Sequence, residues 1–381
     1  TRTKEKNDYN DDFQSRGFWV NYLSGGSVVN PKYKGLGVPI DMAFAFHTDA
    51  GFTPNDSIIG TLGIYTVQNT EGKTIYNNGV SRWTARDLTD MIQTQIVNDI
   101  RSEFNPSWTR RGLWNRSYSE SRVPEVPTML LELLSHQNFA DMRFGLDPRF
   151  RFTVSRAIYK GILKYLSFNS GQNFAVQPLP VNTFSSRFVD KNKVELRWKP
   201  TIDTIESSAS PTSYVVYTRI NDGGFDNGII TKNNSIIMNV QTGKIYSFKV
   251  TAVNDGGESF PSEILSVYRA PMEQGEVLII NGFDRVSGPD SFTKNGTEAG
   301  FLHQQDGGVP WISDICFTGK QYDFNRNSKY IDNNAPGFGA SEKTHETQVI
   351  AGNTFDYPYL HGNAIKAAGF SFVSCSVLSV L

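Results

Sequence analysis

Short apolar runs alternate with amphipathic segments over residues 1–173. Residues 40–46 and 129–131 are apolar runs of the kind found in buried strands. Apolar residues recur at helical spacing over residues 88–100 and 152–166. Strands that alternate with helices of this length are typical of βαβ units, so the pattern predicts an α/β domain with a mainly parallel sheet.

Three further segments complete this first domain. Residues 7–23 combine an acidic first turn with several aromatic residues, which predicts a helix with an aromatic face. Residues 57–67 have the apolar character of another strand. Residues 108–124 are basic and aromatic, and we expect them to form a long loop. Its rings either stack on sugars or peptides, or pack between domains.

The pattern changes at residue 178 to short alternating runs separated by turn residues. Examples are residues 194–198, 214–217 and 245–250. Several short strands at this spacing are typical of a β-sandwich. We therefore expect a separate all-β domain over residues 174–270.

Two aromatic residues have the positions expected in such a sandwich. Trp198 is placed to fill its core, and Tyr246 stands two residues before the inward-facing Phe248, where a tyrosine corner is found. Residues 242–254 closely resemble a fibronectin type III domain. This resemblance implies the fibronectin type III sandwich for the second domain.

The last part of the chain, residues 271–381, again mixes strand and helix patterns. Residues 276–284 form an apolar strand that leads into a turn, and a helix is predicted near residues 359–368. Residues 370–381 are an apolar run at the end of the sequence. The pattern predicts a partial α/β domain of unknown role, which we expect to continue beyond Leu381.

Charge and cysteine content exclude several classes of function. The chain has 37 Lys and Arg, 38 Asp and Glu, and a net charge of -1, so nothing in its charge favours nucleic acid or an anionic membrane as a partner. No apolar stretch is long enough to predict a transmembrane segment. Cys316 and Cys375 are too few for a disulfide scaffold or a cysteine-based zinc cluster. A polar, uncharged substrate fits this composition best.

Two polar residues follow the buried strands of the first domain. His47 comes directly after residues 40–46, and Glu132 comes directly after residues 129–131. Open α/β sheets place their ligands at the carboxyl ends of strands, so both residues are candidates for a functional site. No His-Glu-Xaa-Xaa-His, Gly-Xaa-Ser-Xaa-Gly or phosphate-binding glycine motif is present in the sequence.

Structural roles are the alternative for both residues. His47 alone is better explained as a strand-end histidine bonded to a backbone partner. Glu132 alone is equally well explained as the ion-pair partner of an arginine, namely Arg16, Arg122 or Arg143. From these residues by themselves the alternatives remain open.

The order of motifs in the first domain resembles the zinc-dependent N-acetylmuramoyl-L-alanine amidases. Residues 45–50, Ala-Phe-His-Thr-Asp-Ala, are similar to the motif of that family whose histidine binds zinc. Residues 127–132, Pro-Thr-Met-Leu-Leu-Glu, are similar to a second motif, with Asn138 following it. Residues 156–162 resemble its helix, and Arg16 resembles an arginine that precedes the zinc motif.

This resemblance implies a complete set of functional residues. His47 is the expected zinc ligand, and the remaining His and Glu ligands are expected upstream of Thr1. Glu132 is the expected catalytic residue, which takes a proton from a zinc-activated water and returns it to the leaving amine. Arg16, Asp49 and Asn138 are expected to bind substrate, although the family often has Asn at the position of Asp49.

The expected activity is hydrolysis of the amide that joins the muramyl group to L-alanine in peptidoglycan. It implies a secreted, periplasmic or cell-envelope protein of a bacterium. Two alternatives stay open: a non-catalytic protein that binds cell-wall or other polysaccharide, and a polysaccharide-degrading enzyme that acts through residues 271–381.

Overall fold

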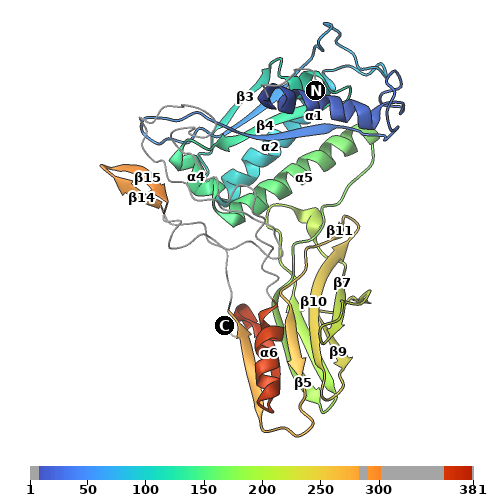
Figure 1. The fold of residues 1–381 in the computed structure, drawn as a ribbon, viewed down its shortest axis with the longest axis vertical. Helices are drawn as coiled ribbons and strands as arrows, with labels where there is room; N and C mark the ends of the chain where they lie inside the picture. Colours follow the sequence, from blue (N-terminus) through green and yellow to red (C-terminus); the bar gives the residue numbers. More distant parts are fainter. Residues whose placement is uncertain (1–7, 283–290, 302–355, 380–381) are drawn as a thin grey trace. The chain divides into compact units, whose positions relative to one another are not determined.

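The computed structural model describes residues 8–282, 291–301 and 356–379 (Figure 1). Cys316 lies outside these ranges. The chain divides into two compact units. The described parts of the first are residues 8–172 and 291–301, and those of the second are residues 173–282 and 356–379.

The first unit contains a four-stranded sheet with helices on both faces. Its elements are α1 (Asp8–Ser24), β1 (Ala43–Asp49), β2 (Thr61–Tyr65), α2 (Thr84–Glu103), β3 (Arg110–Asn115), α3 (Ser119–Arg122), β4 (Thr128–Ser135), α4 (Phe139–Gly145), α5 (Pro148–Ser170), β14 (Ser291–Lys294) and β15 (Thr297–Phe301).

The sheet of the first unit has the strand order β1-β4-β2-β3. Strands β1 and β4 are parallel, as are β2 and β3, whereas β2 and β4 are antiparallel. Two of the three strand pairs are therefore parallel and the central pair is antiparallel, in a unit that is α/β, as the sequence predicts. The prediction that residues 108–124 form a long loop is partly wrong, because this segment contains β3 and α3.

The two faces of this sheet pack differently. Met129 and Leu131 are fully buried in a large core that also includes residues of α2 and α5. Side chains alternate along a strand, so Leu130 points to the opposite face, where it packs with Leu62 and Ile64. Glu132 follows Leu130 by two residues, and this second face is therefore the one that carries the candidate site.

Helices α2 and α5 pack closely side by side (Figure 1). Gly161 makes this approach possible, because a Cβ atom at this position would lie 2.7 Å from Ile92 Cα. An ion pair joins the same helices, with Lys160 Nζ 2.7 Å from Asp99 Oδ2 and both side chains buried. The core beneath the site is therefore fixed by close packing and by a buried ion pair.

The second unit is built around a β-sandwich. Its elements are β5 (Asn182–Asp190), β6 (Lys193–Lys199), η1 (Ser207–Ala209), β7 (Ser213–Ile220), β8 (Ile229–Thr231), β9 (Ser235–Asn239), β10 (Ile245–Asn254), β11 (Gly257–Glu258), β12 (Leu265–Tyr268), β13 (Glu276–Asn281), α6 (Tyr357–Ala367), β16 (Ser371–Ser376) and η3 (Val377–Ser379).

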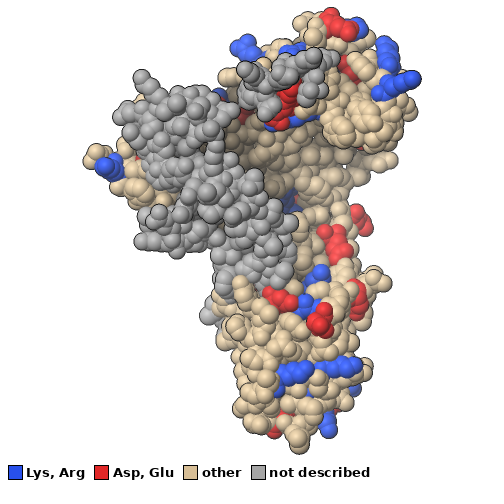
Figure 2. Space-filling view, viewed as in Figure 1, with Lys and Arg blue, Asp and Glu red and all other residues tan. Residues whose placement is uncertain are grey.

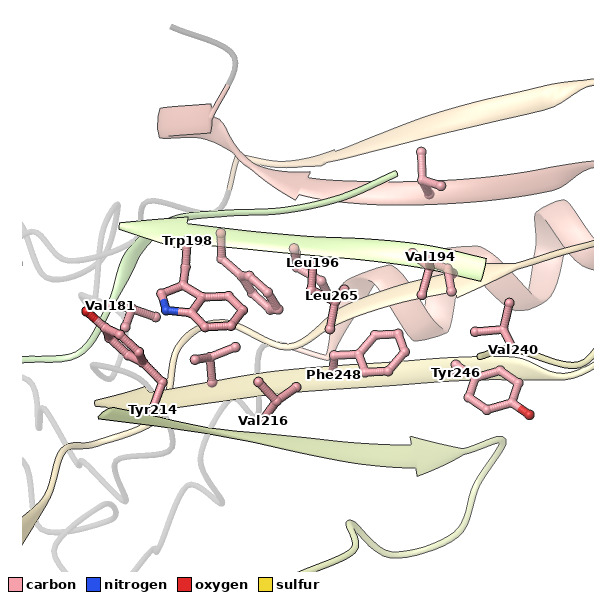
Figure 3. Close-up of a cluster of buried hydrophobic side chains, with 14 of the residues drawn as sticks. Val181, Val194, Leu196, Trp198, Tyr214, Val216, Val240, Tyr246, Phe248 and Leu265 are labelled. Carbon is pink, nitrogen blue, oxygen red and sulfur yellow. The ribbon is translucent and has the colours of Figure 1, made fainter. Parts of the chain in front are cut away.

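The core of the sandwich contains the residues predicted from its alternating pattern. Trp198, Val216 and Phe248 lie between the strands with other apolar side chains (Figure 3). The Tyr246 hydroxyl accepts a hydrogen bond of 3.2 Å from the Gln241 backbone N–H. This bond back to an upstream amide is the one that a tyrosine corner makes.

The prediction of a separate third domain from residue 271 is wrong for the residues that the structure describes. Strand β16 lies between β12 and β5, and it pairs with β13 in parallel. Its residues are buried, so the strand needs neighbours on both edges, and the sandwich provides them. Strands β13 and β16 with helix α6 are an α/β addition to the sandwich.

Strands β14 and β15 form a hairpin that belongs to the first unit. Phe301 is buried against Phe139 and Leu146. The carboxylate of Glu298 forms an ion pair of 3.0 Å with Arg143 on α4. The sequence pattern gives no sign of this return of the chain to its first unit.

The described surface agrees with the nearly balanced charge of the sequence. On the face shown in Figure 2, basic and acidic side chains are interspersed and neither sign dominates. Among the described helices, none is long and apolar enough to cross a membrane.

Candidate functional site

His47 and Glu132 occupy paired positions on neighbouring parallel strands. In the register of β1 and β4, His47 is the partner of Glu132. Paired residues of adjacent strands project on the same face of a sheet, so both side chains belong to the face described above. The structure places the two residues side by side, as the sequence predicts. They lie within their strands rather than after them, because β1 continues to Asp49 and β4 to Ser135.

The carboxyl group of Glu132 is half-buried and incompletely bonded. Its Oε2 atom is buried and has no hydrogen-bond partner among the described residues. Burial raises the pKa of this carboxyl above its ordinary value of 4.5, and the nearby charges of Asp49 and Glu120 raise it further. His47 and Arg111 act in the opposite direction without cancelling the shift. Glu132 therefore holds a proton more readily than an ordinary glutamate.

Glu120 connects two of the predicted site residues. Its Oε2 atom lies 2.8 Å from His47 Nε2, and its Oε1 atom accepts a hydrogen bond of 2.9 Å from Arg16 Nη1. Arg16 also pairs with Asp12 one turn earlier on α1. The short helix α3 supplies Glu120, whose side chain is mostly buried. His47 thus has a carboxylate partner, and not the backbone partner that was the structural alternative.

Sequence reasoning missed Glu120. It lies in residues 108–124, which show neither a strand nor a long helical pattern. A helix of four residues is too short to give a detectable period. The available signal was weak, because a single acid in a basic stretch is ordinarily a solvated side chain.

Asp49 is held by Arg111 of β3. Arg111 Nη1 donates a hydrogen bond of 2.6 Å to Asp49 Oδ2, and the Ala50 backbone N–H donates one of 2.7 Å to Oδ1. Burial raises the pKa of this carboxyl, but these two hydrogen bonds and the charge of Arg111 outweigh it and leave the pKa lowered. Asp49 and Glu132 therefore differ in character, because the pKa of the first carboxyl is lowered and that of the second is raised.

Asn138 has a structural position. Its side chain is 1% exposed and caps α4 by accepting a hydrogen bond of 2.9 Å from Ala140 N. Its Nδ2 atom donates to the Ser57 carbonyl at 2.8 Å. The structure therefore does not bring Asn138 to the site with Arg16, His47 and Glu132, where the resemblance expected it to bind substrate. His136 lies with Nδ1 3.0 Å from Thr48 Oγ1.

A pocket of about 240 Å³ borders the site along β1. It is lined by Arg16 of α1, by Phe44 and His47 of β1, and by Glu120 of α3, among others. Phe46, also in its wall, is 53% exposed. The pocket brings an imidazole, a carboxylate and a guanidinium together with apolar surface, a combination that suits a polar ligand with apolar parts.

The described residues do not fit a complete zinc centre. Catalytic zinc takes three protein ligands and one water. Among the residues that the structure describes, no three His, Cys, Asp or Glu side chains are grouped so that they could hold a metal ion. His47 and Glu120 supply one nitrogen and one carboxylate, and their atoms face each other.

Comparison with known protein families decides the nature of the second unit. Residues 179–268 match the model of the fibronectin type III domain. This segment is a fibronectin type III domain. The match agrees with the predicted range of the sandwich, and the fibronectin type III domain is followed in the same unit by β13, α6 and β16.

Several solved structures are similar to parts of this chain. An N-acetylmuramoyl-L-alanine amidase from Clostridium difficile 630 is 17% identical with a TM-score of 0.30, over 41% of this chain and 65% of its own, which is just under two thirds. The CwlD amidase from Clostridioides difficile, solved with the GerS lipoprotein, is 17% identical with a TM-score of 0.31, over 44% of this chain and 71% of its own. A human FNIII domain is 21% identical with a TM-score of 0.23, over 26% of this chain and 83% of its own. A search of curated proteins found no match.

Proposed function

We propose that the first unit is the catalytic part of a hydrolase that cleaves the amide between the muramyl lactyl group and L-alanine in peptidoglycan. The observation that carries the proposal is the register of β1 and β4, which pairs His47 with Glu132 on one face of the sheet. The motif order around these residues resembles the amidases, and the raised pKa of Glu132 suits a group that transfers protons. In this proposal the protein is secreted or periplasmic, and peptidoglycan is its partner.

Glu132 has the properties that both halves of an amide hydrolysis require. As water attacks the carbonyl carbon, the carboxylate of Glu132 takes the proton that the water loses. The C–N bond then breaks, and Glu132 returns the proton to the departing amine, so that an acid and an amine are formed from one amide and one water. A raised pKa makes the carboxyl a better acid catalyst near neutral pH than an ordinary glutamate.

Zinc enters this proposal only as an ion that His47 would help to bind. The described residues supply no set of three metal ligands. The proton transfer assigned to Glu132 therefore involves only the carboxyl group of this side chain. Arg16 and Asp49 are proposed to position the substrate beside these residues.

The test is release of stem peptides from purified peptidoglycan by the full chain, with and without added zinc. Glu132→Gln removes the proton-transferring group while keeping its size, and we expect activity to fall about 10²- to 10⁴-fold. Glu103→Gln changes an exposed glutamate of α2 and serves as the matched control. Absence of release by the unaltered chain in the presence of zinc, or full activity of Glu132→Gln, would reject the proposal.

One observation favours a second function, binding of cell-wall glycan without catalysis. The contacts of His47 Nε2 with Glu120, and of Glu120 with Arg16, give both side chains a polar partner without a metal. Metal analysis of the purified full chain separates the two functions. A chain that retains no zinc, releases no stem peptide and still binds peptidoglycan would be a binding protein.

A further inference from the structure

A second pocket lies on another side of α1. It has a volume of about 380 Å³ and lies between α1, the loop around residue 33, the turn at residues 69–71 and residues 122–125. We call it the aromatic pocket and define it by Phe18, Tyr22, Tyr33, Asn69 and Arg122, all of which line it. Its volume is within the range of small-molecule sites in proteins.

The rings of this pocket are exposed to solvent. Tyr22 is 47% exposed and Tyr33 is 44% exposed. Trp19, 59% exposed, extends the same surface, since its ring centroid lies 5.5 Å from that of Tyr22. Isolated exposed rings are common on protein surfaces, whereas a group of them around a pocket marks a binding site.

Backbone hydrogen bonds hold these rings in place. The Leu36 N–H donates to the Tyr22 carbonyl at 2.9 Å, and the Val38 N–H donates to the Leu23 carbonyl at 2.9 Å. The loop that carries Tyr33 is thereby fixed to the end of α1. Gly35 permits this contact, because a Cβ atom there would lie 2.0 Å from the Tyr22 carbonyl oxygen. A surface fixed in advance loses little entropy when it binds a ligand.

The turn on the opposite wall is equally fixed. The Asn69 side-chain oxygen accepts hydrogen bonds of 2.9 Å from the Glu71 and Lys73 backbone N–H groups. Asn69 and Thr70 also line the pocket, so its wall presents neutral polar groups beside the rings.

The charges of the pocket do not favour an ionic ligand. Its acids are already paired within the protein, Glu71 with Lys73 and Glu125 with Arg82. Arg122 donates from Nη1 to Ser117, and its buried Nε atom has no hydrogen-bond partner among the described residues. Lys34 also lines the pocket, so its two cations, Lys34 and Arg122, equal its two acids in number. The pocket therefore combines stacking surfaces with hydrogen-bond donors and has no excess of one charge.

A sugar matches these features. The faces of a pyranose ring are apolar and pack on aromatic rings, while its edge carries hydroxyl and acetamido groups that accept and donate hydrogen bonds. We propose that the aromatic pocket binds the N-acetylated amino-sugar chain of the cell wall. This proposal rests on the proposed function, to which it adds a site for the glycan part of the substrate.

The position of the aromatic pocket fits such a role. Residues 120–125 contribute to both pockets, with Glu120 and Pro124 on the side of His47 and Arg122 and Val123 on the side of Tyr22. The same short segment thus borders the candidate catalytic residues and the glycan site.

The experiment is calorimetric titration of the full chain with chitotetraose, a β-1,4-linked tetramer of N-acetylglucosamine. Loss of one stacking ring in Tyr22→Ala or Tyr33→Ala is expected to weaken binding about tenfold. Tyr22→Phe keeps the ring and is expected to bind within about twofold of the unaltered chain. Phe168→Ala removes an exposed ring of α5, far from this pocket in sequence, and is the matched control.

Each result supports or rejects the glycan site. The proposal is overturned if the unaltered chain does not bind chitotetraose, if Tyr22→Ala and Tyr33→Ala bind it unchanged, or if these variants lose affinity only for a free stem peptide. Glu132→Gln removes the proposed catalytic group and leaves the aromatic pocket unaltered, so it distinguishes this proposal from the proposed function. Glycan binding without hydrolysis by the unaltered chain rejects the hydrolase alone, whereas hydrolysis without glycan binding rejects the glycan site alone.

Discussion

At the scale of single residues, the burial of Glu132 links the candidate site to stability. Its raised pKa means that the folded chain holds a proton at pH values at which the unfolded chain has lost it. Stability therefore falls as the pH rises from the ordinary value of 4.5 through the raised pKa of the folded state, and the loss is complete above it. Ionisation of Glu132 therefore lowers the free energy of unfolding.

Glu132→Gln is expected to remove this pH-dependent loss of stability. The variant cannot ionise at this position, so the difference in free energy of unfolding between variant and unaltered chain should grow across that pH window in favour of the variant. Urea unfolding at several pH values measures it. Because Asp99, Asp141 and Glu298 also have raised pKa values, only the difference between the two chains reports on Glu132. A difference that is constant with pH would contradict the assignment.

Single residues also show which parts of the site could be predicted from the sequence. His47 and Glu132 were predictable because each follows a recognisable buried run, and parallel strands bring such positions together. Glu120 was not predictable, since its helix has four residues and no period. Asn138 was predicted at the site from its place after a motif, yet its amide caps α4, which only three-dimensional contacts reveal.

At the scale of elements, buried serines attach β16 to the sandwich. Ser374 Oγ donates to the Ser266 carbonyl at 2.7 Å and accepts from the Ser266 N–H at 2.8 Å. The Ser374 backbone bonds to Ser186 Oγ on the other side, at 2.7 and 3.0 Å. One hydroxyl thus satisfies two backbone groups between β12 and β16.

Ser374→Ala is therefore expected to destabilise the second unit by about 1–3 kcal/mol, because it leaves two buried backbone groups of Ser266 without these partners. Thermal unfolding measures the change. Ser207→Ala, at an exposed serine of η1, is the control and should stay within about 0.5 kcal/mol. Equal stability of Ser374→Ala and the control would show that the serine contacts do not hold the strand.

This addition also explains why the third domain was predicted wrongly. The apolar run at residues 370–381 indicates a buried strand, and the structure has β16 there. A hydrophobic pattern tells that a strand is buried but not which sheet buries it. The neighbours of β16 come from residues far apart in the sequence, namely Tyr268, Ser185 and residues 276–281.

At the scale of the whole molecule, the main core of each unit is built, among the described residues, from that unit's own side chains. The sequence predicts the order of the two cores along the chain. It does not predict that residues 291–301 belong to the first unit, because the pattern of a short hairpin does not indicate which core it packs against. Leu131 is fully buried in the core of the first unit, and Phe248 is fully buried in the core of the second. Separate cores are expected to unfold in separate cooperative transitions.

Calorimetric unfolding of the full chain tests this division with one core variant in each unit. Leu131→Ala should destabilise one transition by about 2–5 kcal/mol, and Phe248→Ala should destabilise the other by about 3–5 kcal/mol, since each leaves a cavity that its own core cannot fill. Each variant is the control for the other, because the transition of the unaltered unit should keep its midpoint. A single transition, or a shift of both transitions by either variant, would mean that the two cores unfold together.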